Sequence, residues 1–217
     1  MNHDAVGVFA QPITRIKCDV EGVCEFFDDV VKRKDDSVRN ELPGGGSPDL
    51  KHYHNYSNVF NIYPELKNLH DQLIEKSNFV YRKVMNYESD VFITNAWFNE
   101  CQIGGSQDFH SHNNCVLCGT LYLRTDENTE FLFNSPFGAS KIAPNLFDKA
   151  SNKPNEFGYN YHQTRIYISP DQGDCLFWPS FLSHGYFSNE TPNRLSLSFN
   201  LMPVSFNTIY KPHYIPT

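Results

Sequence analysis

The chain has 217 residues, and 25 acidic against 18 basic side chains give it a formal net charge of −7. This balance argues against general binding to nucleic acids or anionic membranes, which need clustered basic charge, and six cysteines are too few for a disulfide scaffold. No apolar stretch approaches the ~20 residues of a membrane-spanning helix, and the N-terminus lacks the regions of a secretory signal. We therefore expect a cytoplasmic protein with reduced thiols.

The first ninety residues predict one extended segment and two helices. Residues 6–18 read as extended, with Pro12 indicating an edge position or a strand end. Asp19 is a candidate N-cap for a helix that runs to about Arg33, because apolar residues then recur at helical spacing. Residues 34–50 contain the run PGGGSP and predict a loop. A second helix is expected from Pro64 to Met85.

After residue 90, short apolar runs alternate with turn residues and predict strands. The runs are 91–99, 115–124, 130–134, 165–169, 174–178, 184–188 and 194–203. The pattern favours a sandwich, barrel or jelly roll. The stretch 137–163 interrupts it and has little periodicity, which predicts a long functional loop. We expect a single α+β domain over 1–217, mainly β, with 1–90 as mostly helical support and 91–203 as the β core.

Three histidines suggest a metal site. His110 and His112 open the strand expected before residue 124, and residues i and i+2 of a strand point to the same face. Neutral imidazole is a common ligand of first-row metals. The pair alone would fit surface or capping histidines better, but the distant His184, after a buried-looking strand, favours a metal. His52 and His54 share the spacing in a polar stretch, and we expect them to be structural.

Ten residues after His184 comes Arg194, with Ser196 on the same strand face. A cation beside a metal site is costly to bury unless it meets an anion, and the guanidinium fork matches a carboxylate. Arg194 taken alone would fit an ordinary surface arginine. With the histidines, it predicts a metal next to an anionic organic ligand.

Together these residues resemble the Fe(II)/2-oxoglutarate-dependent oxygenases, which have a double-stranded β-helix (jelly-roll, cupin-like) fold. The usual pattern of that superfamily is HxD/E, a distant His, and Arg or Lys about ten residues later. The chain is more closely similar to one little-characterised subgroup. The segments that carry this resemblance are VFAQPI at 8–13, WFN at 97–99, HSHNNCVLCGTLYL at 110–123, PSFLSH at 179–184 and RLSLSFN at 194–200.

The resemblance implies Fe(II) on His110, His112 and His184, and 2-oxoglutarate as co-substrate. Arg194 would pair with the distal carboxylate of 2-oxoglutarate, and Ser196 would hydrogen-bond to it. Tyr122 shares strand parity with the first two histidines, and it is either a further cofactor-binding residue or plain core. The implied reaction hydroxylates a C–H bond of an unidentified small molecule or peptide and releases succinate and CO₂. Independently of the resemblance, the length of 137–163 and the aromatic residues at its end suggest either a mobile lid over the metal cavity or an ornamental surface insertion.

Two departures from the superfamily pattern leave alternatives open. HxH replaces HxD/E, so the usual carboxylate ligand is missing unless Asp108 supplies it, and three-histidine zinc sites are common. Cys118-Gly119 stands where the subgroup has Ser-Gly. The alternatives are a three-histidine jelly-roll metalloenzyme that does not use 2-oxoglutarate (a dioxygenase, or a zinc hydrolase or lyase) and a non-catalytic jelly-roll binding protein.

Two further expectations concern cysteines and partners. Cys115 and Cys118 are three residues apart, which would put their thiols on opposite faces of a strand and predicts structural cysteines. We expect no nucleic-acid or membrane partner. The oligomeric state is open, with a homodimer as one option.

Overall fold

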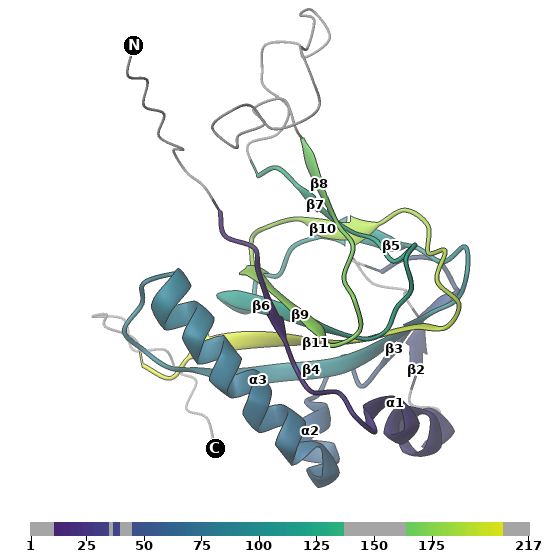
Figure 1. Cartoon of the computed structure of the whole chain (residues 1–217), viewed down its shortest axis with the longest axis horizontal. Helices are drawn as coiled ribbons and strands as arrows, with labels where there is room; N and C mark the ends of the chain where they lie inside the picture. Colours follow the sequence, from purple (N-terminus) through teal and green to yellow (C-terminus); the bar gives the residue numbers. More distant parts are fainter. Residues whose placement is uncertain (1–10, 35–36, 40–44, 137–163, 206–217) are drawn as a thin grey trace, which may run out of the picture.

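The computed structural model describes residues 11–34, 37–39, 45–136 and 164–205 (Figure 1). The predicted lid, 137–163, lies outside these described residues. The strands in the described part are β1 (Thr14–Lys17), β2 (Ser37–Arg39), β3 (Leu50–Tyr53), β4 (Val91–Cys101), β5 (Gln107–His110), β6 (Leu117–Arg124), β7 (Phe131–Asn134), β8 (Arg165–Ile168), β9 (Asp174–Pro179), β10 (His184–Tyr186) and β11 (Arg194–Pro203).

The described strands form two antiparallel sheets. The larger has seven strands in the order β1-β9-β6-β11-β4-β3-β2, and the smaller has four in the order β5-β10-β7-β8. Figure 1 shows the smaller sheet lying over one face of the larger. This is the jelly-roll architecture that the sequence predicts, and the expected α+β fold class is confirmed.

Helical segments cover the opposite face of the larger sheet. They are α1 (Val23–Phe26), a π-helical turn η1 (Phe27–Val31), the 3₁₀ turns η2 (Lys32–Lys34) and η3 (Pro64–Leu66), α2 (Val59–Ile62), α3 (Lys67–Phe79) and a π-helical turn η4 (Val80–Val84). In Figure 1, α3 runs obliquely across β4 and β11. The apolar stripe of this helix supplies Leu69 and Leu73, which are buried against the sheet. No helix in the described segments combines the length and the apolar character that crossing a membrane requires.

The larger sheet has a different core on each face. Phe27, Leu73 and Phe98 belong to the core between the helices and the sheet. Phe133 and Trp178 belong to a second core, between the two sheets. The polar site described below opens into this second layer.

Strand β11 divides its side chains between the two faces because successive residues of a strand point in opposite directions. Leu195, Leu197, Phe199 and Leu201 are fully buried in the helix-side core. Arg194, Ser196 and Ser198 alternate with them and line a pocket between the sheets. The polar and apolar residues of this strand therefore serve two separate layers.

The N-terminal segment differs in detail from its prediction. The first helix starts at Val23, because Gly22 takes a left-handed φ of 74° at its N-cap. Asp19 does not cap it; its carboxylate accepts a hydrogen bond from the Glu21 backbone N–H instead. The predicted loop at 34–50 contains β2 and the start of β3, which pair with each other and extend the larger sheet. The edge position expected near Pro12 is confirmed by β1.

Candidate metal centre

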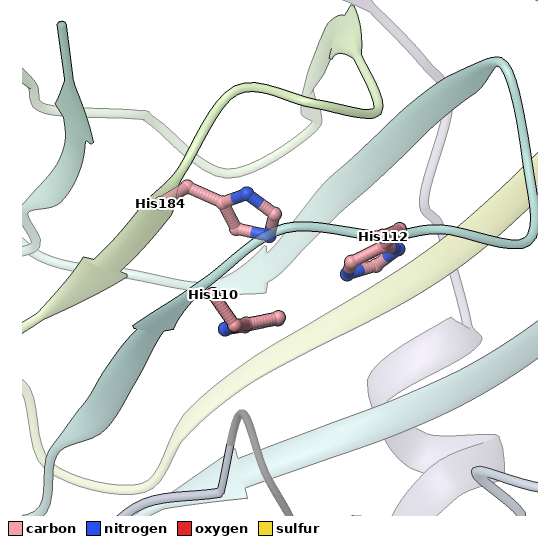
Figure 2. Close-up of side chains that lie close together, drawn as sticks. All are labelled: His110, His112 and His184. Atoms are coloured by element: carbon pink, nitrogen blue, oxygen red, sulfur yellow. The ribbon is translucent and has the colours of Figure 1, made fainter. Parts of the chain in front are cut away.

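Three imidazole rings converge between the sheets (Figure 2). His110 ends β5 and His184 begins β10, and the two residues face each other in the register of these strands. His112 follows in the connection between β5 and β6. The ring centroids are 4.5 Å apart for His110 and His184 and 5.2 Å apart for the other two pairs. One ligand nitrogen from each residue lies within 4.8 Å of the others, which is close enough to share a metal ion.

The two histidines of the HxH motif meet for a reason other than the predicted one. The strand-parity argument is wrong, because β5 ends at His110 and β6 starts only at Leu117. His112 is held instead by its backbone N–H, which donates to the carbonyl of Ser180 at 2.9 Å. Strand β5 itself was missed, because its four residues carry little apolar alternation.

Each ring is fixed through its Nδ1 atom. The Nδ1 of His110 lies 2.8 Å from the carbonyl oxygen of Asp108, and that of His184 lies 2.8 Å from the carbonyl oxygen of Leu182. The Nδ1 of His112 lies 2.6 Å from the side-chain oxygen Oδ1 of Asn200. Because these oxygens only accept, each Nδ1 carries the proton and each Nε2 keeps a lone pair. Metal-binding histidines are typically oriented in this way.

Burial keeps two of the three rings, those of His184 and His110, ready to bind a cation. It lowers the pKa of His184 well below its ordinary value, and a charge on His110 or His112 would lower it further. The pKa of His110 is lowered in the same way, first by burial and then by His112, although the Asp108 carbonyl opposes this. Neutral imidazole is the form that binds a metal.

A glycine allows the two strands that carry His110 and His184 to approach each other. A Cβ atom at Gly185 would lie 2.6 Å from the backbone oxygen of Gln107 in β5, closer than any real side chain allows. The register of β5 and β10 also shifts between His184 and Tyr186. The spacing of the His110 and His184 rings therefore depends on glycine, which has no side chain, at position 185.

The pocket beside the histidines contains a buried cation. Arg194 is only 4% exposed, and its guanidinium carbon lies 4.0 Å from the ring centroid of Tyr186 and 5.7 Å from that of Tyr122. Among the described residues no carboxylate lies within 4 Å of it. Burying an unpaired cation is costly, so the pocket suits an anion.

Two buried hydrogen-bond donors also face this layer without an acceptor in the described part of the chain, the Nε1 of Trp178 and the hydroxyl of Tyr122, which lies beside the Arg194 guanidinium. Burial raises the pKa of Tyr122, although the charge of Arg194 acts in the opposite direction. The hydroxyl is therefore protonated at neutral pH and can donate. Both residues line the pocket with Arg194 and Ser196.

The structure brings the predicted site residues together: His110, His112, His184, Arg194, Ser196 and Tyr122 all line this one pocket. Their roles as ligands stay predictions. Asp108 is not among the residues whose ligand atoms are close enough to share the metal ion, and its side chain is exposed. No carboxylate in the described residues replaces the missing acid of the HxD/E pattern at this centre.

A polar network that the sequence did not predict lies on the floor of the pocket. Asn99 accepts hydrogen bonds from Trp97 Nε1 at 3.0 Å and from His52 Nδ1 at 2.5 Å, and it donates to Ser198 at 2.9 Å. Ser198 also hydrogen-bonds to Thr120. The polar alternation along β11 was the available signal for Ser198, whereas nothing local linked His52 to Asn99.

The two cysteines of the CxxC motif also differ from their prediction. Cys115 precedes β6, so strand parity does not apply to it, and its sulfur lies 3.5 Å from that of Cys118. The Cys118 sulfur lies 3.3 Å from Nδ1 of His112. The expectation that the two thiols face opposite sides is therefore wrong.

Comparisons with known proteins agree with this geometry. Residues 95–200 match the family model described as "Putative 2OG-Fe(II) oxygenase", and no curated protein sequence matches the chain. The non-heme alpha-ketoglutarate-dependent carbocyclase SnoK from nogalamycin biosynthesis is 12% identical, with a TM-score of 0.62 over 89% of this chain and 80% of SnoK. HygX from Streptomyces hygroscopicus, solved with nickel, 2-oxoglutarate and hygromycin B, is 16% identical, with a TM-score of 0.56 over 90% of this chain and 84% of HygX. A prolyl-4-hydroxylase from Pseudomonas putida is 10% identical, with a TM-score of 0.52 over 88% and 92%. At these identities the solved structures support the fold.

Proposed function

Because the chain is a member of the 2-oxoglutarate/Fe(II) oxygenase superfamily through residues 95–200, we propose that it is a dioxygenase that hydroxylates a C–H bond of a small molecule or a peptide. Fe(II) and 2-oxoglutarate are the cofactor and co-substrate of this superfamily, so the protein is an oxidoreductase. Release of succinate and CO₂ would accompany the hydroxylation. We place this activity in the cytoplasm and expect no nucleic-acid or membrane partner.

The observation that carries this proposal is a three-imidazole cluster beside a buried guanidinium that has no carboxylate partner among the described residues. His110, His112 and His184 offer three nitrogen ligands and no negative charge, so a divalent cation keeps its full charge there. A dicarboxylate that reaches from this cation to Arg194 would neutralise both positive ends. The residues present therefore fit Fe(II) together with 2-oxoglutarate.

The bound pair supplies the oxidising chemistry, and the chain supplies position and shelter. Arg194 would hold the distal carboxylate of 2-oxoglutarate by a bidentate contact, and the Tyr122 hydroxyl and Ser196 would donate hydrogen bonds to the same oxygens. Phe131, Trp178 and Tyr186 wall the pocket. These rings exclude water, which strengthens the contact between the guanidinium and the carboxylate.

The decisive experiment is an anaerobic titration of the metal-free protein with Fe(II) and then 2-oxoglutarate. We expect a metal-to-ligand charge-transfer absorption in the visible region, and then succinate formation when oxygen is admitted. His184→Ala should abolish metal binding, whereas Asp108→Ala should retain it. Wild-type protein that binds Fe(II) but gives neither the absorption nor succinate would contradict the proposal.

Arg194 gives the sharpest variant for this test. Arg194→Ala should weaken 2-oxoglutarate binding by about 2–5 kcal/mol, the range for truncating one partner of a buried charge pair, while Fe(II) stays bound. Arg194→Lys keeps the charge but loses the planar fork, so it should recover only part of the affinity. Equal 2-oxoglutarate affinity in wild type and Arg194→Ala would show that this arginine does not bind the co-substrate.

A further inference from the structure

A pair of thiols touches one of the three candidate metal ligands from behind. Cys115 and Cys118 have their sulfur atoms 3.5 Å apart, and Cys118 contacts Nδ1 of His112 at 3.3 Å. Both thiols also donate toward Oδ1 of Asn200, at 3.5 and 3.8 Å. The same oxygen accepts the hydrogen bond from Nδ1 of His112 at 2.6 Å. Asn200 thus links the thiol pair to the ring.

We propose that Cys115 and Cys118 form a reversible disulfide, and that its formation weakens metal binding through His112. The second half of this proposal rests on the proposed function, because it needs a metal on the three histidines. The first half concerns the thiols alone.

The geometry allows the bond with little movement. A disulfide requires a sulfur–sulfur distance of about 2.05 Å, so the two atoms must close by roughly 1.5 Å. Cys115 lies in the connection before β6 and is not paired with a neighbouring strand. Cys118 is the second residue of β6, and its pairing with β9 fixes its position. Cys115 also keeps 9% of its surface exposed, which gives a small oxidant access to one member of the pair.

The reaction balances with a peroxide as the oxidant. Each thiol loses its proton and one electron, and a sulfur–sulfur bond forms. The O–O bond of hydrogen peroxide breaks, and its two oxygens leave as two molecules of water. A small-molecule dithiol reverses the change by thiol–disulfide exchange. Both protein thiols are restored, and the dithiol becomes a disulfide.

Oxidation changes the surroundings of His112 in two ways. Both S–H donors to Asn200 disappear, and the Cys118 sulfur moves relative to the ring nitrogen that it contacts. Asn200 alone then determines the orientation of the ring. The Cys118 sulfur is the second outer contact of this ring beside Asn200, and changes to the outer contacts of a metal-binding histidine typically lower metal affinity 10- to 100-fold.

Two other arrangements of cysteines in the chain have to be distinguished from this disulfide: a metal site at the same thiols and a second cysteine pair. Cys115, Cys118 and His112 also form a group that is close enough to share a metal ion, but Nδ1 of His112 donates to Asn200 and so has no free lone pair. Cys18 and Cys175 are a second neighbouring pair, with a contact between their side chains. That pair lies at β1 and β9, on the helix-side core, away from the histidines.

The test oxidises the full-length chain and reads the disulfide and the metal separately. Metal-free protein is treated with hydrogen peroxide, then with catalase, and remaining thiols are alkylated under denaturing conditions for peptide mass mapping. Mn²⁺ affinity is measured before and after, because Mn²⁺ does not favour thiol ligands. Cys115→Ser removes the pair, and Cys24→Ser is the matched control, since Cys24 donates to the Leu123 carbonyl at 3.2 Å and packs against the helix-side core.

We expect a disulfide that joins Cys115 to Cys118, its loss on treatment with dithiothreitol, and an Mn²⁺ dissociation constant at least tenfold higher in the oxidised protein. Cys24→Ser should behave like wild type, and Cys115→Ser should keep the same Mn²⁺ affinity with and without peroxide. A disulfide between Cys18 and Cys175 in place of the expected one, or a Cys115–Cys118 disulfide that leaves Mn²⁺ affinity unchanged, would overturn the proposal. A reduced protein that binds no Mn²⁺ would contradict the proposed function and the linkage with it, whereas the mass map still reports on the disulfide.

Discussion

Buried polar side chains around the pocket fall into two groups. His52, Asn99 and Trp97 satisfy one another within the chain. Arg194 has no carboxylate partner among the described residues, and the Tyr122 hydroxyl has no acceptor for its proton there. Because an unsatisfied buried donor costs free energy, the second group indicates what a ligand must bring, namely oxygen atoms with negative charge.

His52 should make the stability of the protein depend on pH. Burial lowers its pKa to about 4, although the hydrogen bond with Asn99 opposes the shift. The unfolded state, with a pKa near 6.5, binds more protons between pH 6.5 and 4, so stability falls as the pH falls through this window. His52→Gln should reduce the slope of the unfolding free energy against pH by about 1.4 kcal/mol per pH unit, the value for one proton. Denaturation of metal-free protein between pH 7 and 5 measures the slope, and identical slopes would refute the assignment.

At the level of single residues, the sequence predicted the site where metal or anion binding requires a particular residue type. Three histidines and an arginine at this spacing predicted a metal beside an anion, and the structure brings these residues to one pocket. The sequence indicated a structural role for His52, which its burial fits, but it did not reveal the partner Asn99, which lies 47 positions away on the neighbouring strand. Long-range pairs of this kind leave no periodic signal.

At the scale of elements, the approach of β5 to β10 determines the spacing of the histidines. Gly185→Ala places a methyl group against the Gln107 carbonyl, which should push the strands apart and lower metal affinity at least tenfold without removing a ligand. Gly119→Ala is the matched control. Its added Cβ would lie 2.3 Å from the Phe199 ring in the helix-side core, so it should lower thermal stability more than metal affinity. If both variants lose affinity and stability in the same proportion, strand spacing is not the cause.

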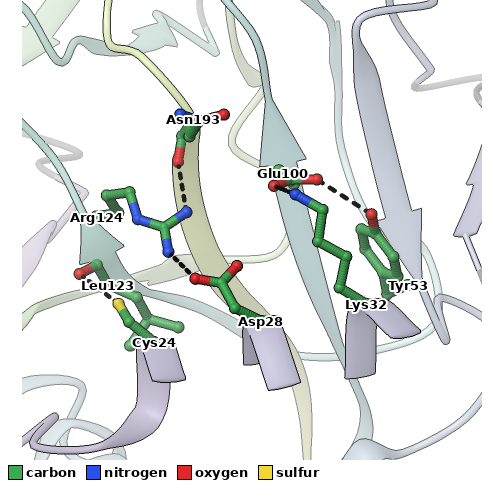
Figure 3. A network of polar contacts seen from close by, with 8 residues as sticks. All are labelled: Cys24, Asp28, Lys32, Tyr53, Glu100, Leu123, Arg124 and Asn193. Atoms are coloured by element: carbon green, nitrogen blue, oxygen red, sulfur yellow. Dashed lines mark hydrogen bonds and ion pairs between the residues drawn. The ribbon is translucent and has the colours of Figure 1, made fainter. Parts of the chain in front are cut away.

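A polar network attaches the first helical segment to the larger sheet (Figure 3). The Lys32 ammonium lies 2.5 Å from the carboxylate of Glu100, which also accepts from the Tyr53 hydroxyl at 3.1 Å. Nearby, Arg124 pairs with Asp28 at 2.7 Å. The Glu100 side chain is 2% exposed and the Lys32 side chain is 43% exposed, so the carboxylate depends on the lysine.

Removing that lysine should leave a buried carboxylate poorly compensated. We expect Lys32→Met to lower the unfolding free energy by about 2–3 kcal/mol, somewhat less than for a fully buried pair, because water reaches the lysine. Adding Glu100→Gln should recover most of the loss. Arg33→Met breaks the exposed pair of Arg33 with Asp29 and should change stability by less than about 0.5 kcal/mol. Urea denaturation compares the variants, and equal losses for Lys32→Met and Arg33→Met would argue against the network.

The elements that sequence periodicity predicted best are the long strands and α3, whose patterns are long enough to recognise. The irregularities were not accessible. In β4, the side chains that face the helices change from odd positions, Val91 and Ile93, to even positions, Ala96 and Phe98. The change occurs because Thr94 is an extra residue without a partner in β11. This bulge moves the odd positions Trp97 and Asn99 to the pocket. Such a bulge depends on the partner strand, which a local pattern does not contain.

At the scale of the whole molecule, the larger sheet separates the apolar core under the helices from the layer that holds the pocket. Leu197→Ala should therefore cost about 2–5 kcal/mol of unfolding free energy, since the side chain is fully buried, and leave ligand affinity nearly unchanged. Ser198→Ala, the next residue on the opposite face, should cost only about 1 kcal/mol, for its hydrogen bonds. Chemical denaturation and 2-oxoglutarate titration of both variants test this separation. A large loss of stability in Ser198→Ala would contradict it.

The alternation along β11 also decides which kinds of mutation this protein can accept. A point mutation in the strand changes either a residue of the helix-side core or a residue that faces the pocket. Substitutions on the pocket face can therefore change the substrate without lowering the stability of the fold. Inserting or deleting one residue exchanges every position from one face to the other. Lineages that carry this fold can therefore diversify their chemistry by substitution in β11, whereas changes of length are confined to the loops.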